Sequence, residues 1–307
     1  MKNHIMIAIM GLLLVAPFHA KADTKDKMNL FACEPEWAAL AEKIGGDRLE
    51  SFTATTARQD PHHIRAKPSL IAAMRRADLV LCSGASLEIG WLPILLEKSG
   101  NANMQPGGKG YIMAADYVPM LEKPIRLDRA DGDVHPEGNP HIQMNPHNIA
   151  LVAKELTKNL QAIDPKNTAY YQQRFDDFSH EWGNAIIKWE KDAESLKGMK
   201  LVVHHKSFSY LLDWLQIKEL TSLESKPGIP PSSGHLESVL QKLKTDSAKL
   251  IIRTPYEPED ASKWLSTKTG IEAVVLPYTV GGDAQATDLF SLFNRTIELL
   301  KKAKNDQ

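Results

Sequence analysis

The sequence has 307 residues, of which 43% are hydrophobic and 24% are charged, and its formal net charge is −1. These values are ordinary for a soluble globular protein and leave room for two domains. The charge is close to zero and no basic stripe is present, which argues against a nucleic acid as partner.

The N-terminal residues have the pattern of a secretory signal peptide. Lys2 supplies a positive start, residues 5–15 are apolar, and Ala20-Lys21-Ala22 fits an A-x-A cleavage site. The apolar run is too short to span a bilayer. We therefore expect residues 1–22 to be removed. The product should be a free periplasmic protein, because a lipid anchor needs a cysteine at the cleavage site and the first cysteine is Cys33.

The two cysteines, Cys33 and Cys82, both belong to stretches that we predict to be strands. We favour two reduced, buried side chains that pack as small hydrophobic groups. A disulfide is the alternative, because cysteines often pair in an oxidising compartment. The sequence alone cannot decide this, since it does not show the Cα spacing that a bridge needs.

The first half of the mature chain alternates short apolar runs with amphipathic stretches. Strands are predicted at 28–33, 49–55 and 78–82, and helices at 35–45, from Pro68 onwards and at 87–98. This alternation is typical of an α/β lobe with a parallel sheet, whose functional residues lie at the carboxyl ends of the strands. His62, in the sequence Asp60-Pro61-His62-His63, lies just beyond such an end.

Residues 107–138 are the least regular part of the chain. They include an acidic, turn-rich segment, residues 131–138, which contains His135. We favour a solvated surface loop here. The alternative is a loop that captures metal for a nearby site through His135 and the adjacent acids.

A long helix is predicted at 165–197, after an amphipathic helix at 148–160. Asp164 is its expected N-cap and Pro165 its first helical residue. Apolar and mostly aromatic residues recur along it at steps of three and four, which indicates one buried face. Such a helix would be about 50 Å long, enough to join two lobes and to restrict their relative motion.

The rest of the chain repeats the alternation of strands and helices. Strands are predicted at 200–203, 220–223, 249–253 and 273–276, and helices at 208–214, from Ser233 onwards, at 261–267 and at 288–302. The predicted fold is therefore α/β, with two parallel-sheet lobes, 23–164 and 198–307, joined by the helix at 165–197.

Three histidine motifs stand in stiff or strand-end settings. His62 follows a proline, His141 lies between Pro140 and Pro146, and His205 follows a predicted strand. Proline fixes its own φ and directs the preceding residue away from the helical region, so these segments are stiff. Imidazole is a good donor for zinc and similar ions. Together the motifs predict a metal centre in the cleft between the lobes, completed by a carboxylate, a donor set that calcium and magnesium do not favour.

The order and spacing of these motifs resemble those of the cluster A-I solute-binding proteins. These are the periplasmic zinc and manganese receptors of ABC importers. The resemblance rests on Asp60-Pro61-His62, on Asn139-Pro140-His141 with Asn145-Pro146, and on His205 followed by Lys-Ser-Phe-Ser-Tyr210. It covers essentially the whole mature chain. It implies a metal in the interlobe cleft, an ABC transporter membrane permease as partner and no enzymatic activity. We also expect a monomer, and a zinc metallochaperone stays open as a second partner.

Carried over motif by motif, the resemblance assigns metal ligands to His62, His141 and His205. His63 is the alternative to His62 as first ligand, and His204 is interpreted as structural. A histidine at the third position, where manganese-type members carry a glutamate, favours Zn²⁺ over Mn²⁺.

The fourth ligand departs from the family pattern. The family places an aspartate directly after the last strand, whereas here the first aspartate after Leu276 is Asp283. We name Asp283 as the fourth ligand, with Glu224 or a water molecule as alternatives.

The sequence thus predicts a high-affinity zinc receptor that delivers Zn²⁺ to an ABC importer. A manganese receptor of the same family is the first alternative. A periplasmic zinc hydrolase is a second, but the chain has no H-E-x-x-H motif and no glutamate next to the three histidine clusters. A structural zinc protein or adhesin is a third, and it would unfold when its metal is removed.

Overall fold

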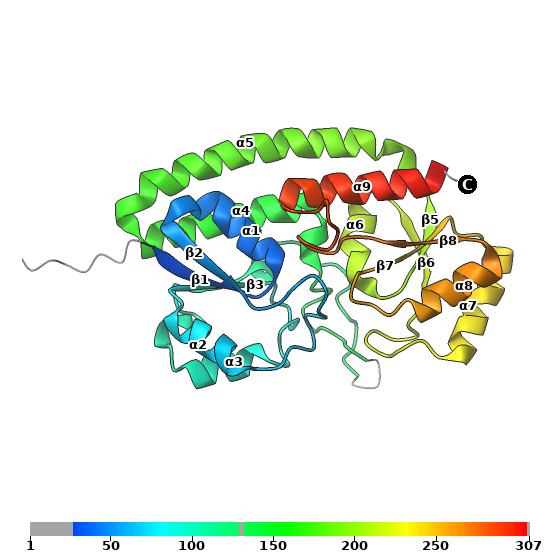
Figure 1. Cartoon of the computed structure of the whole chain (residues 1–307), viewed down its shortest axis with the longest axis horizontal. Coiled ribbons are helices and arrows are strands. Elements are labelled where there is room, and N and C mark those ends of the chain that lie inside the picture. The colour runs from blue at the N-terminus through cyan, green and yellow to red at the C-terminus, as the bar shows by residue number, and fades with distance from the viewer. Residues whose placement is uncertain (1–26, 129–131, 306–307) are drawn as a thin grey trace, which may run out of the picture.

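The computed structural model describes residues 27–128 and 132–305, so the predicted signal peptide, residues 1–22, lies outside the described part. The described chain forms two four-stranded sheets, each covered by helices. A long helix, α5 (Thr168–Asp192), passes over both (Figure 1). The predicted α/β class with two parallel-sheet lobes is confirmed.

The N-terminal sheet is entirely parallel, with the strand order β2-β1-β3-β4. Its strands are β1 (Met28–Ala32), β2 (Leu49–Thr53), β3 (Leu79–Cys82) and β4 (Tyr111–Met113). Side chains alternate between the two faces. Leu30 and Leu81 pack with helices α1 (Pro35–Gly45) and α4 (Pro146–Ile163). Phe31 and Val80 pack with α2 (Pro68–Arg76) and α3 (Leu92–Ser99) on the other face.

Two elements of this lobe differ from the prediction. Strand β4 lies inside the segment expected to be irregular, because a strand of three residues has too few positions to show an alternating pattern. Helix α3 begins at Leu92 rather than at Leu87. The residues before it form turns, in which the buried Glu88 carboxylate accepts hydrogen bonds from the amides of Ser83 and Gly84.

The two cysteines form a disulfide, which corrects our preference for reduced side chains. Cys33 directly follows β1 and Cys82 ends the neighbouring strand β3, so the parallel pairing brings their Cα atoms to 4.8 Å. This spacing lies within the usual range for a bridge. The pairing register, which the sequence does not show, is what decided the outcome.

Helix α5 is shorter than the predicted range of 165–197. It is flanked by 3₁₀ turns at Pro165–Asn167 and Glu194–Leu196, so its α-helical part spans about 37 Å. Asp164 does not cap it, because its carboxylate accepts hydrogen bonds from the Tyr171 hydroxyl and from the side-chain amide of Asn167. The buried face is the predicted one: Tyr171, Phe178, Trp182, Ile186 and Trp189 point into the core.

The C-terminal sheet has the same arrangement, with the strand order β6-β5-β7-β8 and all pairs parallel. Its strands are β5 (Lys200–Val203), β6 (Lys218–Ser222), β7 (Leu250–Arg253) and β8 (Glu272–Val275). Helices α7 (Ser233–Thr245) and α8 (Asp260–Thr269) cover one face, against Val202 and Ile251. Helices α6 (Ser209–Trp214) and α9 (Leu289–Asn305) cover the other.

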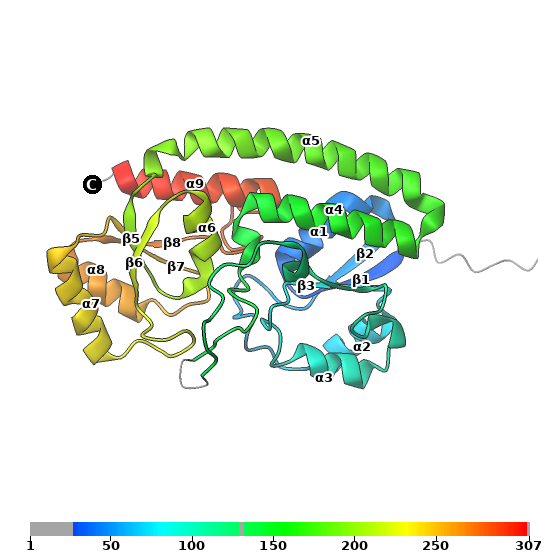
Figure 2. The same cartoon turned by 180° about the vertical axis from the view of Figure 1, so that it is seen from behind.

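One hydrophobic core runs through both lobes. It contains residues of both sheets together with α1, α4, α5 and α9, and Figures 1 and 2 show α9 lying beneath α5. Burial of this apolar surface stabilises the two lobes as one body. Among the described residues, every helix is too short or too polar to cross a membrane.

Candidate metal centre

The site is formed by three loops that meet between the lobes. His62 lies in the loop after β2, and His205 follows β5 by two residues. His141 comes just before a 3₁₀ turn, Ile142–Met144, that leads into α4. Two of the three histidines therefore follow the carboxyl ends of parallel strands, where binding residues of such sheets gather.

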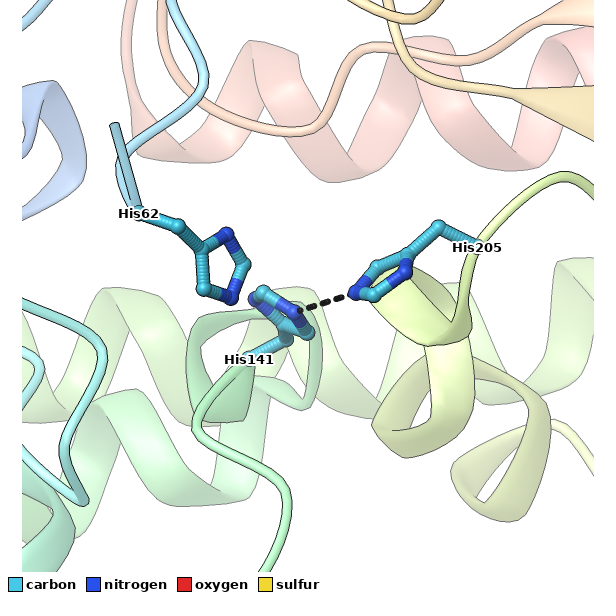
Figure 3. A group of neighbouring side chains, drawn as sticks. All are labelled: His62, His141 and His205. Atoms are coloured by element: carbon cyan, nitrogen blue, oxygen red, sulfur yellow. Dashed lines mark hydrogen bonds between the residues drawn. The ribbon is translucent and has the colours of Figure 1, made fainter. Parts of the chain in front are cut away.

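The three predicted histidines lie together. Their candidate ligand atoms are all within 4.8 Å of one another, and the Nε2 atoms of His141 and His205 are 3.4 Å apart. Figure 3 shows the three rings pointing toward one another from three different segments of the chain. All three side chains are largely buried.

A second hydrogen-bonding group holds each imidazole by its other nitrogen. The three pairs are His62 Nδ1 with Asp60 Oδ1 at 2.7 Å, His141 Nδ1 with the Tyr278 hydroxyl at 2.6 Å, and His205 Nδ1 with Glu224 Oε2 at 2.7 Å. A carboxylate that accepts from Nδ1–H fixes the tautomer in which Nε2 carries the free lone pair. Asp60 and Glu224 thus turn two lone pairs toward the centre.

The donor atoms at the centre lack ordinary partners. His62 Nε2 is buried and has no hydrogen-bond partner among the described residues. The Nε2 atoms of His141 and His205 have only each other as partner among the described residues, at 3.4 Å, and this contact is a hydrogen bond only while one of them carries a proton. A cation that accepts lone pairs satisfies all three nitrogens, so the residues present fit a divalent metal with a preference for imidazole.

Burial and charge affect the protonation of these histidines differently. Burial lowers the pKa of His141 well below its ordinary value, and repulsion from the neighbouring histidines lowers it further. Burial also acts to lower the pKa of His205, but the hydrogen bond and charge of Glu224 outweigh it, so this pKa is raised. Burial therefore favours the neutral imidazole that binds metal at His141, whereas at His205 a proton competes with the metal up to a higher pH.

The proline motif around His141 is tied to the other lobe. The Asn139 side chain accepts from the His141 amide at 2.9 Å and donates to the Lys206 carbonyl at 2.9 Å. The Tyr210 hydroxyl donates to the Asn139 carbonyl, also at 2.9 Å. These contacts connect the segments that carry His141 and His205 without a metal.

The structure does not bring Asp283 to the histidines. Asp283 is absent from the group of potential ligands, and its Oδ1 lies 3.2 Å from Arg295 Nε in an ion pair. Glu224, the alternative fourth ligand, contacts His205 through Nδ1 and supports that ring from behind. Three of the four predicted ligands, the histidines, thus lie together in the structure.

The remaining histidines of these motifs lie beside the centre. The His63 side chain is exposed, with its Nε2 4.0 Å from Asp133 Oδ2. His204 is buried, and burial lowers its pKa to about 4. The His135 ring centroid is 5.4 Å from that of His62, and burial followed by repulsion from His62 lowers the His135 pKa to about 4.

Two small cavities border the centre. One of about 170 Å³ is lined by His135, His141 and His205, among others, and another of about 120 Å³ is lined by Asp60, His62 and Glu224 with others. Both are too small for an organic substrate of ordinary size and are suited to water or an ion.

Sequence reasoning missed one residue of the centre, Tyr278. It lies in the stretch just after the last strand, β8, and its side chain is buried. Its position beyond the carboxyl end of a parallel strand indicates the right edge of the sheet but does not indicate the contact with His141.

The sequence profile of one protein family, described as zinc-uptake complex component A, periplasmic, matches residues 31–303. The match covers most of the chain, and the protein belongs to this family. The fold and the three converging histidines agree with that membership.

Curated relatives carry manganese or unspecified metal in their names. The manganese ABC transporter substrate-binding lipoprotein PsaA of Streptococcus pneumoniae is 28% identical over 243 residues, 77% of this chain and 74% of that protein. The metal ABC transporter substrate-binding lipoprotein SloC of Streptococcus mutans is 22% identical over 93% of this chain and 92% of that protein. With other relatives the match is shorter: for PsaA of S. pneumoniae serotype 4 it spans 55% of that protein.

Solved structures share the fold across nearly the whole chain. A crystal structure of ZnuA superimposes with a TM-score of 0.75 at 21% identity, and the match covers 91% of this chain and 99% of that one. A manganese-bound periplasmic metal-binding protein from Candidatus Liberibacter asiaticus gives a TM-score of 0.72 at 18% identity, covering 90% of this chain.

Proposed function

We propose that the protein is a periplasmic receptor that binds Zn²⁺ with high affinity and delivers it to the membrane permease of an ABC importer. The observation that carries this proposal is the convergence of three imidazole Nε2 atoms, each backed by a partner at Nδ1. Such backing orients the ring and raises the basicity of the ligand. Membership of the zinc-uptake family supports the same function.

The chemistry of the donors favours zinc over manganese. Three neutral nitrogens suit zinc, whereas carboxylate, carbonyl and water oxygens suit manganese. His62, His141 and His205 take three positions of a tetrahedral zinc site and leave one for a further donor. Asp283 supplies that donor only if it turns away from Arg295 toward the histidines.

Other features support a periplasmic protein whose cargo is released rather than transformed. The Cys33–Cys82 disulfide fits an oxidising compartment. Ligands from both lobes allow cargo to leave when the lobes or their loops move apart. A signal peptide at residues 1–22, a monomeric state and a zinc metallochaperone as second partner stay predictions.

We test this function by counting and titrating bound metal in metal-stripped protein. The variants are His62→Ala, His141→Ala and His205→Ala, and the matched control is His147→Ala. His147 is exposed and is paired with Glu190 at 2.9 Å, away from the centre. We expect wild type and the control to bind one Zn²⁺ per chain. Each of the other three variants should lose at least 100-fold in affinity, because one of three protein donors is removed.

The proposal fails if the wild-type chain binds no stoichiometric metal. It also fails if the three ligand variants bind zinc as tightly as the control does.

A further inference from the structure

The segment after β8 crosses from the C-terminal lobe to the N-terminal lobe before α9 begins (Figure 1). Two adjacent residues of this segment, Tyr278 and Thr279, contact the N-terminal lobe at different points. The Tyr278 hydroxyl is 2.6 Å from His141 Nδ1, and the Thr279 hydroxyl donates a hydrogen bond to Glu36 Oε2. The segment is thus held at both residues by the opposite lobe.

Glu36 occupies an unusual place for a carboxylate. It lies in the first turn of α1 and is completely buried, and its Oε1 has no hydrogen-bond partner among the described residues. Burial raises the pKa of Glu36 to about 7, against the opposing hydrogen bonds of Thr279 and of its own amide. Among the described residues, the ionisable groups that interact with it are Glu34, Glu88 and Tyr278, all of them also buried.

A buried carboxyl group with an unsatisfied oxygen contributes little net stability. Glu36 instead fixes the position of the Thr279 hydroxyl, because that hydroxyl is its one side-chain partner among the described residues and both residues are shielded from water. The partial positive charge at the start of α1 favours an acceptor at this position. Glu36 therefore fixes Thr279, and with it the backbone of the neighbouring Tyr278.

Tyr278 needs such positioning to serve His141. Its ring packs edge-on against His141, Phe208 and Tyr256, with centroid distances of 5.5, 6.4 and 5.7 Å. These contacts hold the orientation of the ring, but the distance of its hydroxyl from His141 Nδ1 also depends on where the backbone of Tyr278 lies. A hydrogen bond at 2.6 Å is lost when the backbone shifts by about 1 Å, and the His141 ring can then turn Nε2 away from His62 and His205.

We propose that Glu36 is a positioning residue of the metal centre, acting through Thr279 and Tyr278 on His141. The proposal rests on the proposed function, in which His141 is a ligand. Glu36 touches no ligand itself, yet it links helix α1 of one lobe to a loop of the other at the point where the cargo is held. Metal affinity and the relative placement of the lobes are thereby coupled.

The test compares variants that remove the hydrogen bond between Glu36 and Thr279 with variants that keep it. Thr279→Val removes the hydroxyl, and Thr279→Ser keeps it. Glu36→Gln keeps an acceptor for the hydroxyl and removes the charge. The matched control is Thr296→Val, because Thr296 is also fully buried but donates within α9 to the Leu292 carbonyl.

Three quantities are measured for each variant: the zinc affinity by chelator competition, the visible spectrum of the Co²⁺ complex, and the thermal midpoint of the metal-free protein. We expect Thr279→Val to weaken zinc binding 10- to 100-fold, the usual effect of removing outer-shell support, and to shift the cobalt bands. Thr279→Ser and Glu36→Gln should stay within about threefold of wild type. Thr296→Val should lower the thermal midpoint and leave affinity and spectrum unchanged.

Wild-type affinity and an unchanged cobalt spectrum in Thr279→Val would overturn this inference alone, provided that His141→Ala still loses zinc. An equal loss of affinity in Thr279→Val and Thr296→Val would overturn it as well, since the effect would then follow from general destabilisation. A wild-type chain that binds no metal would overturn the proposed function and this inference together.

Discussion

At the scale of single residues, metal binding depends on the group that supports each histidine. Glu224 raises the pKa of His205 above its ordinary value of 6.5, against the effect of burial. A proton on His205 competes with the metal, so zinc affinity in the wild type should begin to fall at a pH above 6.5 and continue to fall on acidification. The support and the pH dependence thus have the same origin.

Glu224→Gln separates the two effects. We expect affinity at pH 7.5 to fall roughly 10-fold or more, because the oriented carboxylate is lost. Burial of His205 remains and now lowers its pKa, so the further loss of affinity between pH 7.5 and pH 5.5 should be smaller than in the wild type. Chelator competition at both pH values measures this, with Glu237→Gln on the exposed face of α7 as the control. Parallel pH profiles for the variant and the wild type would contradict the role of Glu224.

The sequence predicted the three histidines because each stands in a motif with a local cause. Proline stiffens the segments of His62 and His141, and a strand end presents His205. Support by Tyr278 depends on how a loop of one lobe meets the other lobe, and the ion pair of Asp283 with Arg295 depends on how that loop packs against α9. The contact of Tyr278 with His141 joins residues 137 positions apart, and no local sequence pattern encodes it.

At the scale of elements, the Cys33–Cys82 disulfide fixes two neighbouring strands of the N-terminal sheet. The bridge closes a segment with a sequence separation of 49 residues. The chain-entropy model gives a stabilisation of about 4 kcal/mol for a loop of this size, at the upper end of the typical range of about 2–4 kcal/mol. The bridge lies in the core between β1 and β3, and neither cysteine belongs to the group of potential ligands formed by the three histidines, so it should affect stability far more than binding.

We therefore expect the double variant Cys33→Ser/Cys82→Ser to unfold in urea with about 2–4 kcal/mol less free energy than the oxidised wild type. Zinc affinity of the folded variant should remain within about threefold. A reductant should destabilise the wild type and leave the variant unaffected, which serves as the control. Equal stability of variant and oxidised wild type would show that the bridge is absent in solution.

Elements with a repeating pattern were predicted well, and short or context-dependent ones were not. The aromatic stripe identified the buried face of α5, because it runs over several turns. The predicted ends of α5 were wrong, because 3₁₀ turns take the place of the α-helix there. The pairing of Cys33 with Cys82 needed the register of β1 and β3, which becomes known only when the sheet is assembled.

At the scale of the whole molecule, we expect the fold to form without the metal. A single core spans both lobes, α5 and α9, and hydrogen bonds such as Tyr210 to Asn139 join the lobes directly. This arrangement suits a receptor that must stay folded after it has released its cargo. A structural zinc protein would instead gain its folding free energy from the metal.

Removal of metal by a chelator should consequently leave the far-ultraviolet circular dichroism and the cooperative thermal transition intact. Added zinc should raise the thermal midpoint, because a ligand that binds only the folded state stabilises it, by about 4 kcal/mol at a thousandfold excess over Kd. Loss of helical signal on chelation would identify a structural zinc protein and would exclude the receptor.

The most direct test of the central claim is a competitive titration of metal-stripped protein with Zn²⁺ and Mn²⁺, wild type beside His141→Ala. The account predicts one zinc per chain, bound at least 100-fold more tightly than manganese because the three donors are nitrogens, and clearly weakened in the variant. Tighter binding of manganese would contradict the choice of cargo. A wild type and a variant that bind zinc equally well would contradict the site itself.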